Sequence, residues 1–327
     1  MFWQITRIVL TLATLLLAVC FMLGIAFSSQ IDYLSGSIFL ALTLLLWVPW
    51  RGLFLTWVYF QHRKEAGLGK RLTFLAEFLP ALMFYSHYRP AHHDHPQNKD
   101  ESLLLVTLNA YEPNKKIAPK AEFLIDLEAD FVTVSEVNDK WELILANLKH
   151  TYPYQKLTRA QDSTKNYHML LLSKFPAKVI KKRASGRIVH YEIQTPQGPV
   201  YLVQLHPCAP FTPRRTLKRD QSIKALGAIK TSLPLIIMGD FNCVPWHKEV
   251  RRVLAAQELT LAGLPEPTYP SLQKVNSRRS VNLKPFAPLD YILIPQEAKL
   301  LNQQTHRVPE TDHLAVSATI TLKDAEN

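Results

Sequence analysis

The apolar positions of the chain are distributed differently before and after about residue 101. Residues 8–27 form a charge-free apolar run of about the length that a membrane-spanning helix requires. A second apolar run covers residues 33–50 and resumes after Arg51 as far as Phe60. The pattern therefore predicts two transmembrane segments, at about 8–27 and at 33–50 or beyond.

Charged residues beside the two runs predict an orientation for this hairpin. The link at residues 28–32 carries no Lys or Arg, whereas the outer flanks carry Arg7 on one side and Arg51, Arg63, Lys64, Lys70 and Arg71 on the other. Because Lys and Arg near membrane segments favour the cytoplasmic side, we expect a helical hairpin followed by a cytoplasmic domain. A cleaved signal peptide is the alternative, although its apolar core is usually shorter.

Residues 61–100 are expected to connect the hairpin to the downstream domain. Residues 72–88 are apolar but interrupted by Glu77 and Pro80, which favours an amphipathic segment in the membrane interface. If this segment spanned the membrane instead, the domain would lie on the opposite side. Residues 89–100 are rich in Pro, His and charge, which predicts a linker.

From residue 102 onwards, short apolar runs alternate with segments of helical spacing. Strands are expected at 103–108, 131–134, 168–172, 188–194, 200–205, 235–238, 289–294 and 314–322. Helices are expected at 119–128, 139–148, 216–230 and 247–257. Strands outnumber helices, so we expect two packed β-sheets covered by helices, an α/β (α+β) fold over residues 101–322 with 323–327 as a tail.

The net positive charge of residues 101–327 suggests an anionic partner. Residues 101–327 contain 30 Lys and Arg against 22 Asp and Glu. A basic domain favours nucleic acid or an acidic lipid headgroup, although a solvated basic surface would give the same count. Arg214, Arg215 and Arg219 follow His206 and open a helix, which makes them candidates for contact with an anionic substrate. The three cysteines do not form a disulfide framework and are expected to be free thiols.

Polar side chains stand at the ends of most predicted strands. They are Asn109, Glu136, His206, Asp240, Asn242, Asp290, Asp312 and His313. A single Asn or Asp after a strand is most often a turn residue, but eight such positions are harder to explain in this way. On one rim of a sheet they would gather carboxylates whose repulsion a divalent cation removes. Oxygen ligands favour Mg²⁺ or Mn²⁺, and zinc is disfavoured because no paired Cys or H-E-x-x-H spacing is present.

The motifs that carry these residues occur in a fixed order. They are TLNAYEPN, TVSEV, VQLHP, MGDFN, LDYILI and TDHLAV, over about residues 102–322. This ordered set resembles the endonuclease/exonuclease/phosphatase superfamily, the group of DNase I, apurinic endonucleases, neutral sphingomyelinases and inositol polyphosphate phosphatases. The chain looks closest to bacterial membrane-attached members. The resemblance implies a four-layer sandwich, with two sheets between helical layers.

The resemblance also implies roles for the acidic and amide residues. Glu136 resembles the metal-binding glutamate of the family, with Asn109 supporting the metal and Asp312 lying near it. Asp240 resembles the group that positions or activates the attacking water. Asn242 resembles the amide that holds the scissile phosphate.

Two histidines complete the implied site. His206 resembles the histidine that contacts phosphate or protonates the leaving oxygen, and its presence points away from apurinic endonucleases. His313 resembles the second essential histidine, with Asp290 as its orienting partner. An oriented pair of His and carboxylate can move a proton during in-line displacement at phosphorus.

Three functions are consistent with these patterns. The first is a membrane-anchored, divalent-metal-dependent phosphoester hydrolase of the phosphodiesterase or nuclease type. The second is a lipid phosphodiesterase or phosphatase of the sphingomyelinase or inositol-phosphatase kind. The third is a non-catalytic basic membrane scaffold that binds nucleic acid. The expected partners are a lipid bilayer and an anionic phosphoester, either nucleic acid or a lipid headgroup.

Overall fold

The computed structural model describes residues 102–322, except 112, 114–115, 161–166 and 275–279. The chain divides into two compact units, residues 1–89 and 90–327. The expected transmembrane segments, the amphipathic segment, the linker and the tail all lie outside the described residues. Among the described helices, none is long and apolar enough to cross a membrane.

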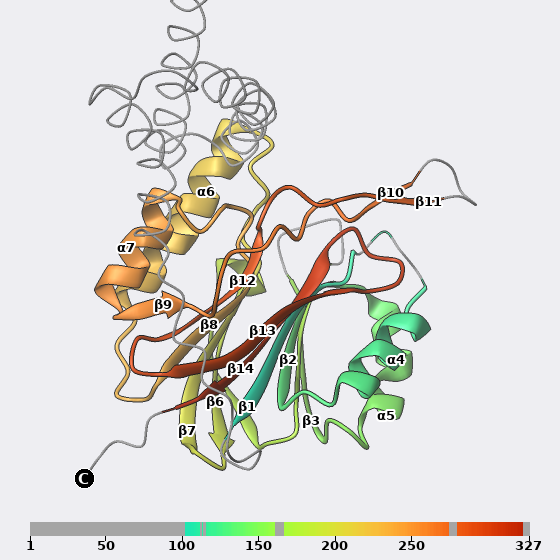
Figure 1. Ribbon diagram of the computed structural model, residues 1–327, viewed down its shortest axis with the longest axis horizontal. Coiled ribbons are helices and arrows are strands. Elements are labelled where there is room, and N and C mark those ends of the chain that lie inside the picture. Colours follow the sequence, from blue (N-terminus) through green and yellow to red (C-terminus); the bar gives the residue numbers. More distant parts are fainter. Residues whose placement is uncertain (1–101, 112, 114–115, 161–166, 275–279, 323–327) are drawn as a thin grey trace, which may run out of the picture. The chain divides into compact units, whose positions relative to one another are not determined.

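Two six-stranded sheets pack face to face (Figure 1). The first sheet has the order β13-β14-β1-β2-β4-β3 and the second has the order β5-β6-β7-β8-β12-β9. The strands of the first are β1 (Leu103–Asn109), β2 (Phe131–Val137), β3 (Tyr154–Thr158), β4 (His168–Ser173), β13 (Lys299–Arg307) and β14 (Leu314–Thr321). Those of the second are β5 (Ala177–Arg183), β6 (Ile188–Thr195), β7 (Gly198–Leu205), β8 (Leu235–Asp240), β9 (Leu259–Leu261) and β12 (Asp290–Pro295). A separate ribbon pairs β10 (Leu272–Lys274) with β11 (Ser280–Asn282).

Helices cover the outer face of each sheet, which gives four layers (Figure 1). On the first sheet lie α4 (Ala118–Leu127), the 3-10 helix η2 (Asp139–Trp141) and α5 (Glu142–Leu148). On the second lie α6 (Pro213–Lys224), the 3-10 helix η4 (Ala225–Ala228) and α7 (Lys248–Ala256); a short 3-10 turn, η3 (Ala184–Gly186), joins β5 to β6. The expected two-sheet fold is confirmed, and the four layers implied by the resemblance are present.

The first sheet is buried on both faces, and its strands are therefore apolar on both faces. In β1, Leu103 and Leu105 belong to the core between the two sheets, whereas Val106 and Leu108 belong to the core beneath α4 and α5. Side chains alternate between the two faces of a strand, so a strand covered on both faces is apolar at nearly every position. The continuous apolar run that predicted this strand therefore has a direct structural cause.

Each sheet has one parallel pair of strands at its centre. In the first sheet β1 runs parallel to β2, and α4 makes the connection between them. In the second sheet β7 runs parallel to β8, and α6 makes the connection. Strand β14 is antiparallel to β1, and β12 is antiparallel to β8. In each sheet, the carboxyl ends of the parallel pair therefore lie at the same edge as the start of an antiparallel neighbour. This neighbour is β14 in the first sheet and β12 in the second.

Several strands of the sheets were not predicted from the sequence. Strands β3, β5, β9 and β13 have mixed or polar patterns; β5, with the sequence AKVIKKR, lies at a sheet edge and is exposed at most positions. Edge strands need little apolar surface and often carry Lys, so their alternation is weak. The helix expected at 216–230 begins earlier, at Pro213, because Thr212 caps it by accepting a hydrogen bond from the backbone N–H of Arg215.

Candidate active site

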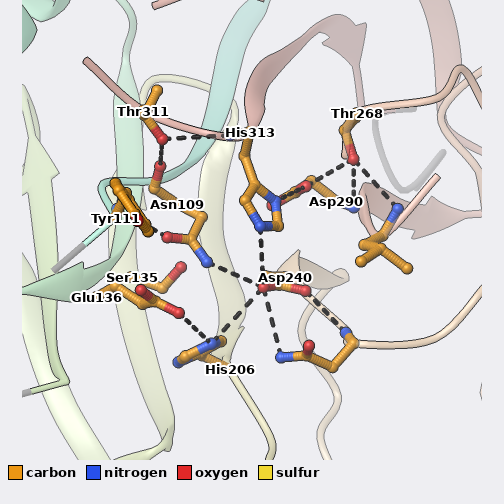
Figure 2. Close-up of polar contacts among 12 residues, drawn as sticks. Asn109, Tyr111, Ser135, Glu136, His206, Asp240, Thr268, Asp290, Thr311 and His313 are labelled. Atoms are coloured by element: carbon orange, nitrogen blue, oxygen red, sulfur yellow. Dashed lines mark hydrogen bonds and ion pairs between the residues drawn. The ribbon is translucent and has the colours of Figure 1, made fainter. Parts of the chain in front are cut away.

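The polar strand ends converge on one rim, where the two sheets meet (Figure 2). Asn109 is the last residue of β1 and Asp240 is the last residue of β8. The Asn109 amide donates a hydrogen bond of 3.0 Å to Asp240 Oδ2, across 131 positions of sequence. This buried contact joins the two sheets at the rim. The prediction that these strand ends gather in one place is confirmed.

A bulge in β2 aims Glu136 at this rim. Glu136 has a φ of 55°, and the pairing of β2 with β4 shifts register between Val134 and Val137. A bulge turns a side chain away from the regular alternation of its strand. The Glu136 carboxylate thereby comes 3.4 Å from His206 Nε2, and its side chain keeps 17% of its surface exposed. Glu136 and Asp312 are the partly exposed carboxylates among the described residues of this rim, whereas Asp240 and Asp290 are buried.

The turn after β8 fixes Asp240. The Asn242 backbone N–H donates to Asp240 Oδ1 at 2.8 Å, and Asn242 has a φ of 51°. Phe241 is buried and stacks on Tyr291 with 3.9 Å between ring centroids, so its ring points into the core. Position 239 accepts only glycine, because a Cβ there would lie 2.0 Å from the carbonyl oxygen of Leu205.

The Asn242 amide points at protein atoms in this structure. Its Nδ2 donates to the carbonyl of Pro207 at 3.1 Å and faces Asp240 Oδ2 at 3.4 Å. This arrangement orients Asp240 next to His206, whose Nε2 lies 3.6 Å from Asp240 Oδ2. The role of Asn242 in holding a phosphate stays a prediction.

The three arginines expected at the substrate lie in different environments. Arg219 is completely buried, and its Nη1 donates to the carbonyl of Asn242 at 3.1 Å. Its other donors reach Asp220, and its Nη2 faces His247. Arg219 therefore supports the backbone of the MGDFN turn from inside the domain. Arg214 is exposed, and Arg215 is half-buried with its guanidinium over the ring of Phe211.

His313 and Asp290 form a buried pair. His313 Nδ1 lies 2.6 Å from Asp290 Oδ2, and its Nε2 faces Asp240 Oδ2 at 4.0 Å. The Thr268 hydroxyl donates to the same Asp290 oxygen at 2.6 Å. The pairing of Asp290 with His313 that the family resemblance implied is present. Thr268 was not predicted, because it stands in an irregular loop without a periodic pattern.

The loop before β14 brings Asp312 to the same rim. The Thr311 hydroxyl donates to the carbonyl of Asn109 at 2.7 Å and accepts from the His313 backbone N–H at 3.3 Å. The Asp312 carbonyl accepts from Ser271. Asp312 Oδ1 is buried and has no hydrogen-bond partner among the described residues. Thr311 was also missed, although it directly precedes the Asp-His pair.

Burial and neighbouring charge set the protonation of this cluster. Burial, followed by the charge of Asp290, raises the pKa of Asp240 to about 6. Burial also raises the pKa of Asp312 to about 6, with a further rise from the charge of Glu136. Burial opposes the charge of Glu136, but the hydrogen bond and charge of His206 lower its pKa to about 2. Burial lowers the pKa of His313, and the charge and hydrogen bond of Asp290 outweigh it, raising the pKa to about 10.

Two sets of residues at this rim can be compared as cation ligands. Ligand atoms of Asp240, Asp290 and His313 lie within 4.8 Å of one another. Asp290 Oδ2 accepts hydrogen bonds from His313 and Thr268, which gives Asp290 an orienting role, while its Oδ1 is buried without a hydrogen-bond partner among the described residues, like Asp312 Oδ1. The second set is Glu136 and Asp312, which repel each other, with Asn109 nearby.

The second set fits a hard divalent cation. Its carboxylate oxygens are the donor type that Mg²⁺ and Mn²⁺ prefer, whereas Asn109 Oδ1 accepts from the Tyr111 backbone N–H and the Asn109 amide nitrogen donates to Asp240. The partnerless oxygen of Asp312 and the repulsion between the carboxylates are both features that a bound cation would relieve. These features are compatible with a cation between Glu136 and Asp312, and the role of Asn109 at the metal stays a prediction.

Three half-buried tyrosines surround the carboxylates. The Tyr269 ring lies 4.8 Å from the ring of His313, and the Tyr167 ring meets His206 edge-on at 6.0 Å. Tyr111 donates its backbone N–H to Asn109 Oδ1 at 2.9 Å. Burial raises the pKa of Tyr111 and of Tyr269, and nearby carboxylates, Asp312 first among them, raise both further.

A sequence model of the endonuclease/exonuclease/phosphatase family matches residues 78–313. No curated protein matches the chain by sequence. Among solved structures, D. rerio TDP2 complexed with single-strand DNA product is 16% identical with a TM-score of 0.52, and the match covers 68% of this chain and 99% of that chain.

Two further structures show the same similarity. The human nocturnin catalytic domain with bound sulfate anion is 14% identical with a TM-score of 0.51, covering 72% of this chain and 100% of that chain. An endonuclease/exonuclease/phosphatase from Beutenbergia cavernae DSM 12333 is 14% identical with a TM-score of 0.51, covering 68% and 72%. At these identities the similarity shows a shared fold.

Proposed function

Because the chain belongs to the endonuclease/exonuclease/phosphatase family, we propose that it is a divalent-metal-dependent phosphoester hydrolase. One observation carries the proposal. Asp240 is held by Asn109 and Asn242 at the rim where the His313–Asp290 pair, His206 and Glu136 converge. Such a cluster combines a buried proton acceptor with an oriented imidazole and a group of cation ligands.

Different side chains are assigned to the two proton transfers of in-line displacement. Asp240 accepts a proton from the attacking water, whose oxygen forms the new bond to phosphorus. A pKa near 6 suits this role, because a general base works best when its pKa is close to the ambient pH. The ester oxygen leaves on the opposite side and takes a proton from His206. His313, held by Asp290, places positive charge 4.0 Å from Asp240.

Glu136, Asn109 and Asp312 are the residues that would hold the cation. A bound Mg²⁺ or Mn²⁺ would supply neutralisation of the negative charge on the phosphoryl oxygens. The proposed substrate is an anionic phosphodiester, either nucleic acid or a lipid headgroup. The D. rerio TDP2 structure contains a single-strand DNA product and the nocturnin structure contains sulfate, which is consistent with an anionic substrate at this fold.

Hydrolysis by the full chain tests this proposal. The purified protein would be assayed with single-stranded and double-stranded DNA, RNA, sphingomyelin, phosphoinositides and a chromogenic phosphodiester, with Mg²⁺, with Mn²⁺ and with a chelator. We expect metal-dependent turnover of at least one substrate. Asp240→Asn should lower kcat by about 100-fold or more, because it removes the proton acceptor while keeping the shape.

Asp126→Asn is the matched control for this experiment. Asp126 is an exposed carboxylate on α4, and its conversion to the amide should leave turnover unchanged. Turnover that persists in Asp240→Asn would refute the assigned role. Salt-sensitive nucleic-acid binding without any turnover would instead favour the non-catalytic scaffold.

We also propose that residues 8–27 and 33–50 anchor the chain in a bacterial inner membrane, with the catalytic domain in the cytoplasm. The support is the charge-free apolar run and the Lys and Arg on its outer flanks. Fusions of cytoplasmic-type and periplasmic-type reporters after His95 test the orientation. We expect activity of the cytoplasmic-type reporter, and activity of the periplasmic-type reporter would show that the orientation is reversed.

A further inference from the structure

The two helical layers of the domain carry opposite charge. Helix α6 contains five Lys and Arg against one Asp, and α7 contains three against one Glu. These two helices therefore account for six of the eight net positive charges of residues 101–327. On the opposite side (Figure 1), α4 and α5 contain three acidic residues against one Lys, which is buried.

The basic layer also exposes apolar side chains. Phe211, just before α6, has 64% of its surface exposed, and Leu217 in the helix has 58%. Arg214 and Lys218 are exposed beside them, three or four positions apart along the helix, so they share one face with Leu217. Apolar tips surrounded by Lys and Arg are typical of a surface that inserts shallowly between lipid headgroups.

This surface differs from the inward face of the same helix. Arg219 and Ile223 point into the domain and are fully buried. The fully buried face of α6 is therefore formed by other residues than Phe211 and Leu217, most of whose surface is exposed. A single exposed Phe would need no explanation, but Phe211 and Leu217 lie beside the exposed Arg214 and Lys218, and this combination favours a contact outside the domain.

We propose that the outer face of α6 and α7, with Phe211 and Leu217 at its leading end, docks on an anionic lipid bilayer. The basic side chains would contact acidic headgroups, while the two apolar side chains enter the interface. Lys and Arg are attracted to the negative surface potential of an anionic membrane, so this layer would turn the domain toward the bilayer. The acidic layer of α4 and α5 would then face away from the membrane.

A lipid surface fits this face better than nucleic acid does. Bases are bound by stacking on several aromatic side chains placed along a groove. The α6 face offers a single exposed ring, which Arg215 already covers at 5.4 Å, together with an aliphatic Leu217. The charge-free run at residues 8–27 adds a second reason, because a chain anchored there keeps its domain beside a bilayer.

Hydrogen exchange of the full chain in lipid nanodiscs tests the docking surface without requiring hydrolysis. Exchange would be compared in nanodiscs of phosphatidylcholine alone and of phosphatidylcholine mixed with phosphatidylglycerol. We expect slower exchange at residues 211–218 only in the anionic nanodiscs, with no change in α4 and α5. The protection should fade at high salt, because the Debye length falls to about 3 Å at 1 M.

Matched variants separate the surface from the fold. Arg214→Ser combined with Lys218→Ser should reduce the protection about 25-fold, since about 1 kcal/mol per charge corresponds to about fivefold each. Phe211→Ser should also reduce it, whereas Leu143→Ser, at a 79% exposed position on α5, should not. Equal exchange in both nanodiscs would overturn the proposal. Protection by a single-stranded oligonucleotide in neutral nanodiscs, without protection by phosphatidylglycerol, would assign the surface to nucleic acid instead.

Discussion

Arg219 shows what a single residue reveals only in three dimensions. Its place among four basic residues suggested contact with a substrate, and nothing in the sequence separated it from Arg214. In the structure its guanidinium is buried and donates to Asp220 and to the carbonyl of Asn242. A buried cation of this kind is held by fixed partners, and removing it leaves those partners without a donor.

Replacing Arg219 should therefore destabilise the domain. Arg219→Met leaves the Asn242 carbonyl and Asp220 without their donors, which costs about 3 kcal/mol. For a domain of this size, that loss lowers Tm by roughly 6–12 °C. Thermal unfolding, monitored by circular dichroism, measures the shift.

Arg214→Met provides the comparison on the same helix. Arg214 is exposed, so its replacement should change stability by no more than about 0.5 kcal/mol. If the two variants unfold at the same temperature, Arg219 does not stabilise the turn that carries Asn242.

At the residue scale, the site was largely predictable because its members stand next to strand ends. Asp240, Glu136 and His313 were all found in this way, since a polar residue directly before or after an apolar run is visible in a sequence. Thr268 and Thr311 were not found, because they act through hydrogen bonds to Asp290 and Asn109 that only the folded chain brings together.

At the element scale, the bulge in β2 connects the core to the site. The register shift after Val134 leaves its carbonyl free of the regular ladder, and the Gln204 amide donates to it at 2.9 Å. Gln204 stands in β7 of the other sheet and is fully buried. Its side-chain oxygen accepts from Tyr191 at 3.1 Å. The Gln204 side chain thus supplies a hydrogen-bond donor to the bulge that directs Glu136 toward the rim.

Gln204→Leu should remove the hydrogen bond between β7 and the bulge in β2. The change removes the buried donor to the Val134 and Leu170 carbonyls and an acceptor of the Tyr191 hydroxyl, at a cost of about 2 kcal/mol. We expect Tm to fall by roughly 4–8 °C and backbone exchange around Glu136 to become faster. Calorimetry and hydrogen exchange provide the two measurements.

Gln194→Leu is the control for this change. Gln194 lies on the neighbouring strand β6 and is exposed, so its loss should be nearly neutral. A neutral Gln204→Leu variant would show that the bulge does not need its hydrogen-bond partner.

Elements of the fold were predictable in proportion to their burial. Strands covered on both faces, such as β1 and β8, are continuous apolar runs and were located correctly. Edge strands such as β5 and β13 were missed, because their exposed positions hide the alternation. The bulge left no trace in the sequence, since its cause is a backbone angle at Glu136 and not a residue pattern.

At the scale of the whole molecule, both sheets contribute to one site. Each has a parallel pair whose carboxyl ends face the other pair, and the Asn109–Asp240 hydrogen bond lies between them. Packed sheets were predictable from the order of strands and helices. Their pairing was not, because the sequence does not show that β14 lies beside β1.

The pairing of β1 with β14 sets the order in which the domain can be completed. The first described strand needs a partner more than two hundred residues downstream, with Leu103 opposite Ile320. Contacts so distant in sequence close slowly, and on the ribosome β1 must wait with one edge unpaired until nearly the whole domain has been translated. A chain that stops before β14 leaves that edge open to aggregation and also lacks Asp312 and His313. An incomplete translation product of this domain would therefore have both an open sheet edge and an incomplete candidate site.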